Sequence, residues 1–159
     1  MARNVRAAVA LIVTVALCYA VWTVIEGSTD PPPPSPNTPL LHVTVLKDGD
    51  SWVASDDREY RLGMVNTAEP GEPCHGEATQ FTRRFLADGF TADSYSRDPH
   101  GRVVAEVFSP DGDSLNVALA ESGLSDDRYL SFRRENPNLA RRLDDAFEQA
   151  ATPPCRLAR

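Results

Sequence analysis

The sequence has 159 residues, enough for one domain of moderate size and a tail. Its 16 basic and 23 acidic side chains give a formal net charge of −7, and the few charges near the N-terminus cancel. Proteins that hold nucleic acid through a global positive field are usually basic, so this charge excludes that mode of binding. Any contact with phosphate must therefore come from locally placed arginines or a bound cation.

An apolar run without charged residues covers residues 7–25 and follows Arg3 and Arg6. About 19 residues at roughly 1.5 Å each just cover a hydrocarbon core of about 30 Å. The flanking arginines indicate a cytoplasmic N-terminus, with the rest of the chain outside the cytoplasm. We therefore expect residues 1–27 to be a transmembrane anchor, so that the N-terminal helix contacts the membrane and the folded part is extracytoplasmic.

A cleaved signal peptide is the alternative, and it would make the protein secreted. Cys18–Ala20 is a poor cleavage site, and the apolar run continues past it through Trp22 to Ile25. Cleavage there would leave these side chains exposed, so the anchor is favoured. Both alternatives predict the same extracytoplasmic destination.

Residues 28–40 contain six prolines and no large apolar residue before Leu40. Such a composition favours extended polyproline II and is typical of a semi-rigid spacer. We therefore expect a Pro-rich linker here, followed by one folded domain at residues 41–159. Cys74 and Cys155 are the two cysteines of this part, and an even count in an oxidising compartment predicts a disulfide between them.

The folded part begins with alternating, β-branched segments. Three strands are expected first, at residues 41–46, 52–54 and 59–65. A helix is expected at residues 77–88, because apolar side chains recur there at helical spacing and Gly89 ends the pattern. The remaining elements are strands at 90–96 and 103–108, a short helix at 114–121 and a third helix that opens at Asn136-Pro137.

This order predicts a mainly β fold with some α: a five-stranded OB-type β-barrel with three helices. One helix between the third and fourth of five short strands is the arrangement of that barrel. OB-type barrels often bind nucleic acids or oligosaccharides.

Three short polar segments are not explained by the strands around them. They are Asp48-Gly49-Asp50-Ser51, the segment from Arg61 to Glu69, and Asp98-Pro99-His100-Gly101-Arg102. In this order, with the helix between the second and third, they resemble the staphylococcal nuclease-like (thermonuclease) family. The family pattern is a DGDT turn, an R-L-x-x-x-D-T-P-E strand end and a D-x-Y-G-R turn. The resemblance runs from about Val43 to Tyr129.

The resemblance implies a Ca²⁺ site. Asp50 would be a carboxylate ligand, Asn66 stands at the position of the second carboxylate, and the main-chain carbonyl of Thr67 would be a third ligand. Hard cations prefer such oxygen ligands. The alternative for Asp50 is that it only caps the turn after Leu46.

The resemblance also implies a catalytic site. Glu69 would orient or deprotonate the attacking water, and Arg61 and Arg102 would bind the scissile phosphate, whose oxygens match the arginine fork. Tyr129 stands where the family has an aromatic residue beside the nucleotide, and His100 could donate to phosphate when protonated.

Each of these residues also has a structural alternative. Glu69 could be an ordinary surface residue. The two arginines could instead pair with acidic neighbours, namely Asp57, Glu59 and Asp98.

The sequence departs from the family pattern at several positions. Asn66 removes one negative charge from the cation site, which should weaken Ca²⁺ binding. Ala68 replaces a proline that stiffens the approach to Glu69. Pro99 and His100 replace the lysine and tyrosine that the family often has near the nucleotide phosphate.

The leading interpretation is a Ca²⁺-dependent nuclease, a phosphodiester hydrolase that acts on DNA or RNA outside the cytoplasm. The expected partners are the nucleic-acid substrate and, through the N-terminal helix, the membrane, and we expect a monomer. The alternative is an OB-fold binding module with weak or no catalysis, tethered to the cell surface. The acidic domain and Asn66 favour the alternative, whereas the joint presence of Asp50, Arg61, Glu69 and Arg102 favours the enzyme.

Overall fold

The computed structural model describes residues 38–150. Within this range the elements are β1 (Val43–Leu46), β2 (Ser51–Ala54), β3 (Glu59–Leu62), β4 (Asn66–Thr67), α2 (His75–Phe85), β5 (Thr91–Arg97), β6 (Val103–Phe108), α3 (Leu115–Glu121), β7 (Ser125–Asp126), the 3-10 turn η1 (Leu130–Phe132) and α4 (Pro137–Gln149). The predicted anchor, most of the predicted linker and Cys155 lie outside the described residues. No helix among residues 38–150 is long and apolar enough to cross a membrane.

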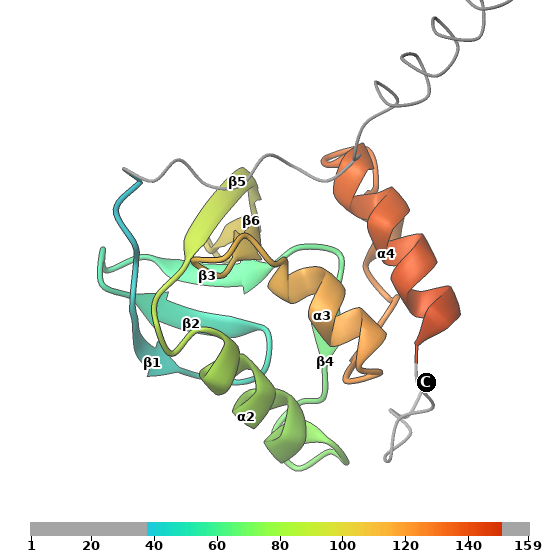
Figure 1. The fold of residues 1–159 in the computed structure, drawn as a ribbon, viewed down its shortest axis with the longest axis horizontal. Coiled ribbons are helices and arrows are strands. Elements are labelled where there is room, and N and C mark those ends of the chain that lie inside the picture. Colours follow the sequence, from blue (N-terminus) through green and yellow to red (C-terminus); the bar gives the residue numbers. More distant parts are fainter. Residues whose placement is uncertain (1–37, 151–159) are drawn as a thin grey trace, which may run out of the picture. The chain divides into compact units, whose positions relative to one another are not determined.

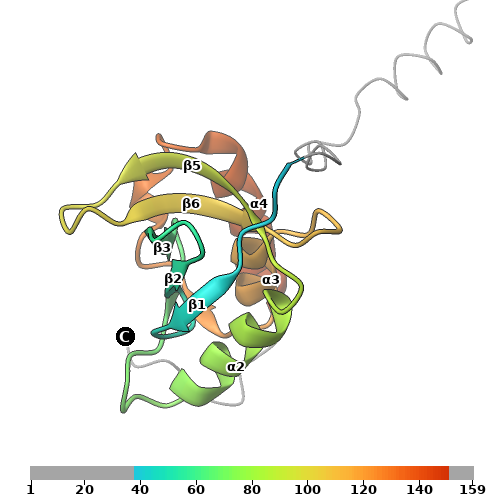
Figure 2. The ribbon, with the colours of Figure 1, turned by 90° about the vertical axis from the view of Figure 1, so that its left-hand side faces the viewer.

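The main sheet has five strands in the order β1-β2-β3-β6-β5 (Figures 1 and 2). All neighbours are antiparallel except β3 and β6, which are parallel. Leu41 and Phe90 join the two ends of this order, because each main-chain N–H donates to the other's carbonyl, at 2.9 and 2.8 Å. A mixed sheet curled in this way, with three α-helices, is consistent with the predicted OB-like barrel.

The third strand is shorter than predicted. It ends at Leu62 instead of residue 65, because Met64 has a left-handed backbone with φ of 60° and turns the chain away from the sheet. The chain then forms β4, which pairs with β7 in a separate two-stranded ladder that the sequence did not predict. This turn places Asn66 and Thr67, two of the predicted cation ligands, on β4.

The first helix begins at His75, two residues earlier than predicted, and ends at Phe85. Cys74 precedes it in a left-handed conformation with φ of 71°. The other helices start where their caps predict: the side chain of Ser114 accepts from Val117 N–H, and that of Asn136 accepts from Leu139 N–H.

An aromatic cluster fills the barrel. The ring of Trp52 stacks on Tyr60, and Phe90 packs edge-on against both, with centroid separations of 5.6 Å. All three residues are buried. Such aromatic pairs hold β2, β3 and the start of β5 together through buried area and ring geometry.

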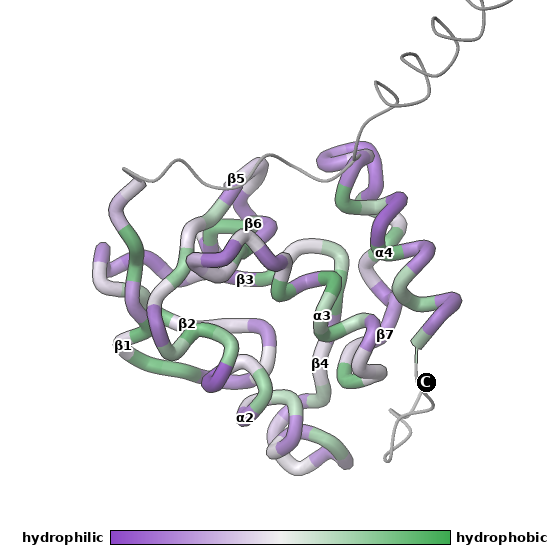
Figure 3. Tube along the Cα trace, viewed as in Figure 1, coloured by the Kyte–Doolittle hydropathy of each residue, from purple (hydrophilic) through white to green (hydrophobic). Residues whose placement is uncertain are grey.

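The helices α3 and α4 lie side by side, opposite β1 (Figure 1). Hydrophobic and hydrophilic residues alternate along α4 (Figure 3), whose buried residues are Leu139, Ala140, Leu143 and Ala146. A nearly buried ion pair between Arg142 and Glu106 ties α4 to β6. The helices therefore support the strands that carry the candidate site.

Candidate active site

The first polar segment forms a tight turn between β1 and β2. The N–H of Asp50 donates to Asp48 Oδ1 at 3.0 Å, and the carbonyl of Gly49 accepts from the Thr82 hydroxyl of α2. A Cβ on Gly49 would lie 2.8 Å from Ala78 Cβ, so helix α2 packs against the turn too closely for any other residue. This packing fixes the position of Asp50 at the start of β2.

The Asp50 carboxylate is buried and receives four polar contacts. Arg61 Nη1 lies 2.8 Å from Oδ1, and the Ser51 hydroxyl donates to the same oxygen at 2.9 Å. The N–H and the hydroxyl of Thr67 donate to Oδ2 at 2.7 and 3.1 Å. Burial raises the pKa of Asp50 to about 6, although the positive charge of Arg61 opposes the rise.

Arg61 connects β3 to the turn that follows it. Its Nη1 also donates to the Leu62 carbonyl at 3.3 Å, and its Nη2 donates to Asn66 Oδ1 at 3.3 Å. The guanidinium carbon lies 5.3 Å from the centre of the Tyr129 ring, a cation–π distance. Arg61 thus contacts three of the residues that the sequence assigned to the site.

Asn66 and Thr67 lie together on β4. The Asn66 amide nitrogen donates to the Thr67 carbonyl at 3.2 Å and lies 3.4 Å from Asp126 Oδ2 on β7. Both residues are buried. Asp126 was not among the residues predicted from the sequence.

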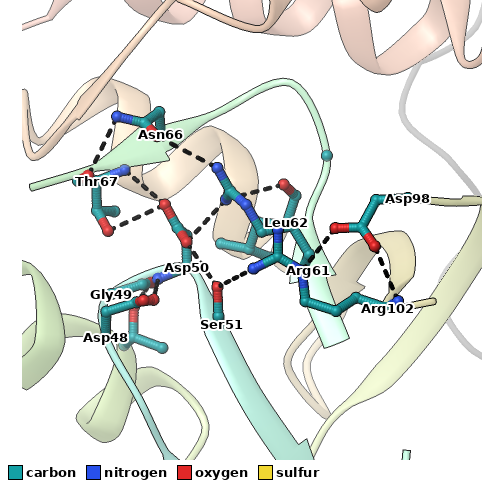
Figure 4. A network of polar contacts seen from close by, with 12 residues as sticks. Asp48, Gly49, Asp50, Ser51, Arg61, Leu62, Asn66, Thr67, Asp98 and Arg102 are labelled. Atoms are coloured by element: carbon teal, nitrogen blue, oxygen red, sulfur yellow. Dashed lines mark hydrogen bonds and ion pairs between the residues drawn. The ribbon is translucent and has the colours of Figure 1, made fainter. Parts of the chain in front are cut away.

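Arg102 reaches the same network from the start of β6 (Figure 4). Its Nε lies 2.6 Å from Asp98 Oδ2, and its Nη1 lies 3.5 Å from the Ser51 hydroxyl. Burial acts to raise the pKa of Asp98, but hydrogen bonds from the side chain and backbone of Arg102 outweigh it and lower the pKa. Asp98 therefore stays ionised and holds the arginine in place.

A cavity of about 300 Å³ lies beside this network. Both arginines line it, as do His100 and Tyr129. Tyr95, Phe132 and Glu135 add aromatic and acidic surface. The cavity thus combines two guanidinium groups with aromatic rings. Guanidinium groups can bind a phosphate, and aromatic rings can stack on a base.

Glu69 is the predicted site residue that the structure does not bring into the network. Its side chain is exposed, and its carboxylate takes no part in the network around Asp50 and Arg61. Its main-chain N–H donates to Glu72 Oε2 at 2.8 Å. Glu69 follows Thr67 by two residues, so it lies at the edge of the site.

The oxygen atoms of three predicted site residues are of the kind that binds a hard cation. Asp50, Asn66 and the Thr67 carbonyl offer oxygen atoms, as Ca²⁺ requires. No three side chains of His, Cys, Asp or Glu converge within residues 38–150, so an all-acid metal cluster is absent from that range. Each candidate oxygen already accepts a hydrogen bond, from Arg61, Thr67 or Asn66. A cation would have to displace some of these donors.

Of the alternative ion pairs predicted for the two arginines, the one for Arg102 is observed and the one for Arg61 is not. Arg102 does pair with Asp98, whereas Arg61 pairs with Asp50, and Glu59 pairs with Lys47 at 2.7 Å. The Asp98 pairing does not remove Arg102 from the cavity. Ser51 bridges Asp50 and Arg102 but was not predicted as a site residue. Its only signal in the sequence is its place in the polar turn.

The barrel and the arginine–carboxylate network define a small β-barrel domain with two arginines at one cavity. A protein-family model described as staphylococcal nuclease homologue matches residues 59–152, more than half of the chain. The chain therefore belongs to the staphylococcal nuclease homologue family. No curated protein sequence matches it.

Proposed function

We propose that the protein is a Ca²⁺-dependent phosphodiesterase, an endonuclease of the thermonuclease type that hydrolyses DNA or RNA. One observation carries the proposal: Arg61 and Arg102 come from different strands, line one cavity, and are joined through Ser51 and the buried Asp50 carboxylate. Two guanidinium groups at one cavity match the oxygens of a phosphodiester and its pentacoordinate transition state.

Arg102 is the better placed of the two arginines for phosphate. Asp98 orients it through Nε, and among the described residues Nη2 has no partner. Arg61 must exchange part of its contact with Asp50 or Asn66 before it binds a phosphate oxygen. We therefore assign charge stabilisation chiefly to Arg102, with Arg61 joining it when the site is loaded.

Asp50, Asn66 and the Thr67 carbonyl would hold the cation. Bound Ca²⁺ would neutralise phosphate charge and polarise the P–O bond. It would also release Arg61 from Asp50, since both cations compete for the same carboxylate oxygen. This exchange favours a phosphate bound together with the cation.

Glu69 would act on the water. Water would attack phosphorus and Glu69 would accept one proton of that water, while the bond from phosphorus to the leaving oxygen breaks and that oxygen takes a proton from solvent water. The exposed carboxylate of Glu69 has no competing partner among the described residues, so it is available to a water. The rings of Tyr129 and Phe132 would stack with a base, and His100 would contact a neighbouring phosphate.

We further propose that the domain acts outside the cytoplasm, as a monomer held by the N-terminal segment or secreted after its cleavage. The support is the apolar run after Arg3 and Arg6. In that compartment Cys74, which is buried, and Cys155 would form a disulfide. The bond would tie the chain after α4 to the start of α2.

A second candidate is a nucleic-acid binding module without catalysis. The observation that favours it is that every candidate cation ligand already has an internal donor, while Glu69 stands apart from the network. The cavity with its arginines and aromatic rings would then bind a strand without cutting it.

The test is cleavage of plasmid and single-stranded DNA by the purified full chain, with Ca²⁺ and with chelator. The Glu69→Gln variant is the control, because it keeps the shape of the side chain and removes the base. We expect degradation with Ca²⁺ that is lost in chelator and in the variant. A folded protein that binds DNA but leaves it intact at millimolar Ca²⁺ would replace the enzyme by the binding module.

A further inference from the structure

The short ladder between β4 and β7 places a carboxylate beside the cation site. Asn66 is paired with Asp126, and Thr67 with Ser125, in antiparallel register. Directly paired residues carry their side chains on the same face of a ladder, about 5 Å apart. Asp126 therefore lies on the face of β4 that carries Asn66.

The contacts of Asn66 show what Asp126 adds. The amide nitrogen lies between two oxygens, the Thr67 carbonyl at 3.2 Å and Asp126 Oδ2 at 3.4 Å. The amide oxygen faces Arg61. A positively polarised NH₂ group thus bridges a carbonyl and a carboxylate oxygen, which are the two kinds of ligand that Ca²⁺ takes.

The charge balance makes this position significant. With Asn66 at the position of the second carboxylate, Asp50 alone would supply negative charge, and Arg61 already neutralises it. Ca²⁺ affinity follows the number of charged ligands. A second carboxylate on the adjacent strand would restore the missing charge.

Asp126 is also available for exchange. Its side chain is 20% exposed, and its cationic partner is Arg128, whose Nη2 lies 3.2 Å away and whose side chain is 53% exposed. Exposed ion pairs contribute little, so a divalent cation can displace this arginine. The other charged group that faces Asn66 is Arg61.

We propose that Asp126 supplies the second carboxylate of the Ca²⁺ site, in place of the carboxylate that Asn66 lacks. The proposal rests on the cation invoked for the proposed function, and it moves one ligand from β4 to its partner strand β7.

The test is calorimetric titration of Ca²⁺ into the full chain, with no nucleic acid present. Asp126→Asn should weaken Ca²⁺ binding about tenfold, as loss of a residue that supports a metal site commonly does. Asp127→Asn is the matched control, since it removes the same charge from the next, exposed residue. It should change the affinity less than about twofold, because exposed charges are screened.

A double variant distinguishes the loss of a ligand from the loss of the fold. Asn66→Asp combined with Asp126→Asn moves the carboxylate back to β4 and should recover affinity to within about threefold of the unmodified chain. Equal affinity in Asp126→Asn and Asp127→Asn would overturn the proposal, as would absence of Ca²⁺ binding by the unmodified chain.

The role of Asp126 as a ligand and the nuclease activity can be refuted independently. If Asp126→Asn binds Ca²⁺ normally while the unmodified chain cuts DNA in its presence, Asp126 is not a ligand and the nuclease stands. If Ca²⁺ binding depends on Asp126 but DNA stays intact, the ligand stands and the nuclease does not.

Discussion

Arg61 and Asp50 form an ion pair of 2.8 Å whose side chains are only 11% and 5% exposed, at the point where a cation is expected to bind. Removing one partner of such a pair leaves the other charge buried and uncompensated. The guanidinium therefore compensates the buried carboxylate, and under the proposed function Ca²⁺ would have to take over that role. Such an exchange would link cation binding to the release of Arg61 towards the cavity.

Ca²⁺ binding should weaken in mild acid. Because the pKa of Asp50 is raised to about 6, protons compete with the cation for this carboxylate below that pH. We expect the affinity to fall about tenfold per pH unit between about pH 6 and pH 4, when titrations at several pH values are compared. A constant affinity between pH 7 and pH 5 would contradict the assignment of Asp50 as a ligand.

The raised pKa of Asp50 affects the stability of the fold in the opposite direction: acid weakens Ca²⁺ binding but favours the folded state. The folded state binds the Asp50 proton more tightly than the unfolded state, whose pKa is near 3.8. Protonation of this group therefore adds stability as the pH falls from about 6 towards 3.8, and that contribution is lost as the pH rises through 6. Denaturant titrations of the unmodified chain and of Asp50→Asn should differ in pH dependence over this range.

Asn66→Asp should tighten Ca²⁺ binding and destabilise the cation-free protein. The new carboxylate would lose the donors to the Thr67 carbonyl and face Asp126 across the ladder, where like charges repel. A bound cation relieves this repulsion. We expect Ca²⁺ to raise the melting temperature of the variant more than that of the unmodified chain. An equal rise in both would show that residue 66 is not a ligand.

Asn116→Ala should destabilise the fold by about 3 kcal/mol, because the buried Val107 N–H and Gly63 carbonyl lose their bonds to this side chain. The buried Asn116 of α3 accepts from Val107 N–H at 3.1 Å and donates to the carbonyls of Gly63 and Ala105 at 2.9 and 3.3 Å. Asn138→Ala, at an exposed position of α4, is the control. Similar unfolding midpoints for the two variants would refute this role.

Tyr95→Phe should stabilise the protein by about 1 kcal/mol. The Tyr95 hydroxyl is buried without a hydrogen-bond partner among the described residues, and burial raises its pKa. Tyr60→Phe is the matched variant and should destabilise, since the Tyr60 hydroxyl donates to Asp56 at 2.8 Å. Urea unfolding of both variants measures the contrast, and a loss of stability in Tyr95→Phe would indicate a partner for that hydroxyl.

Much of the fold was predictable from local patterns. The five barrel strands follow alternating segments, α2 follows its helical apolar spacing, and α3 and α4 follow their caps, so the order of elements was confirmed. The β4–β7 ladder was not predictable, because two residues in each strand show no periodicity. The positive φ of Met64, which ends β3 early, also has no signal in the residue type.

The candidate site was predictable as a set of residues but not as a set of contacts. The spaced motifs identified Asp50, Arg61 and Arg102, which the structure brings into one network. The ion pair between Arg61 and Asp50 could not be predicted, because it depends on how the barrel closes around both residues. Asp126 lies 60 residues from Asn66 in the sequence, so only the ladder between their strands reveals it.

If the two arginines at one cavity stabilise the transition state of phosphodiester hydrolysis, Arg102→Ala should abolish cleavage without unfolding the protein. The measurement is the rate of Ca²⁺-dependent DNA cleavage by the full chain and by this variant, together with the DNA affinity of each. We predict cleavage by the unmodified chain and a loss of at least about a hundredfold in the variant, with circular dichroism unchanged. An unchanged rate in the variant would show that Arg102 does not act in cleavage, and binding without cleavage in both proteins would show that the domain is not a nuclease.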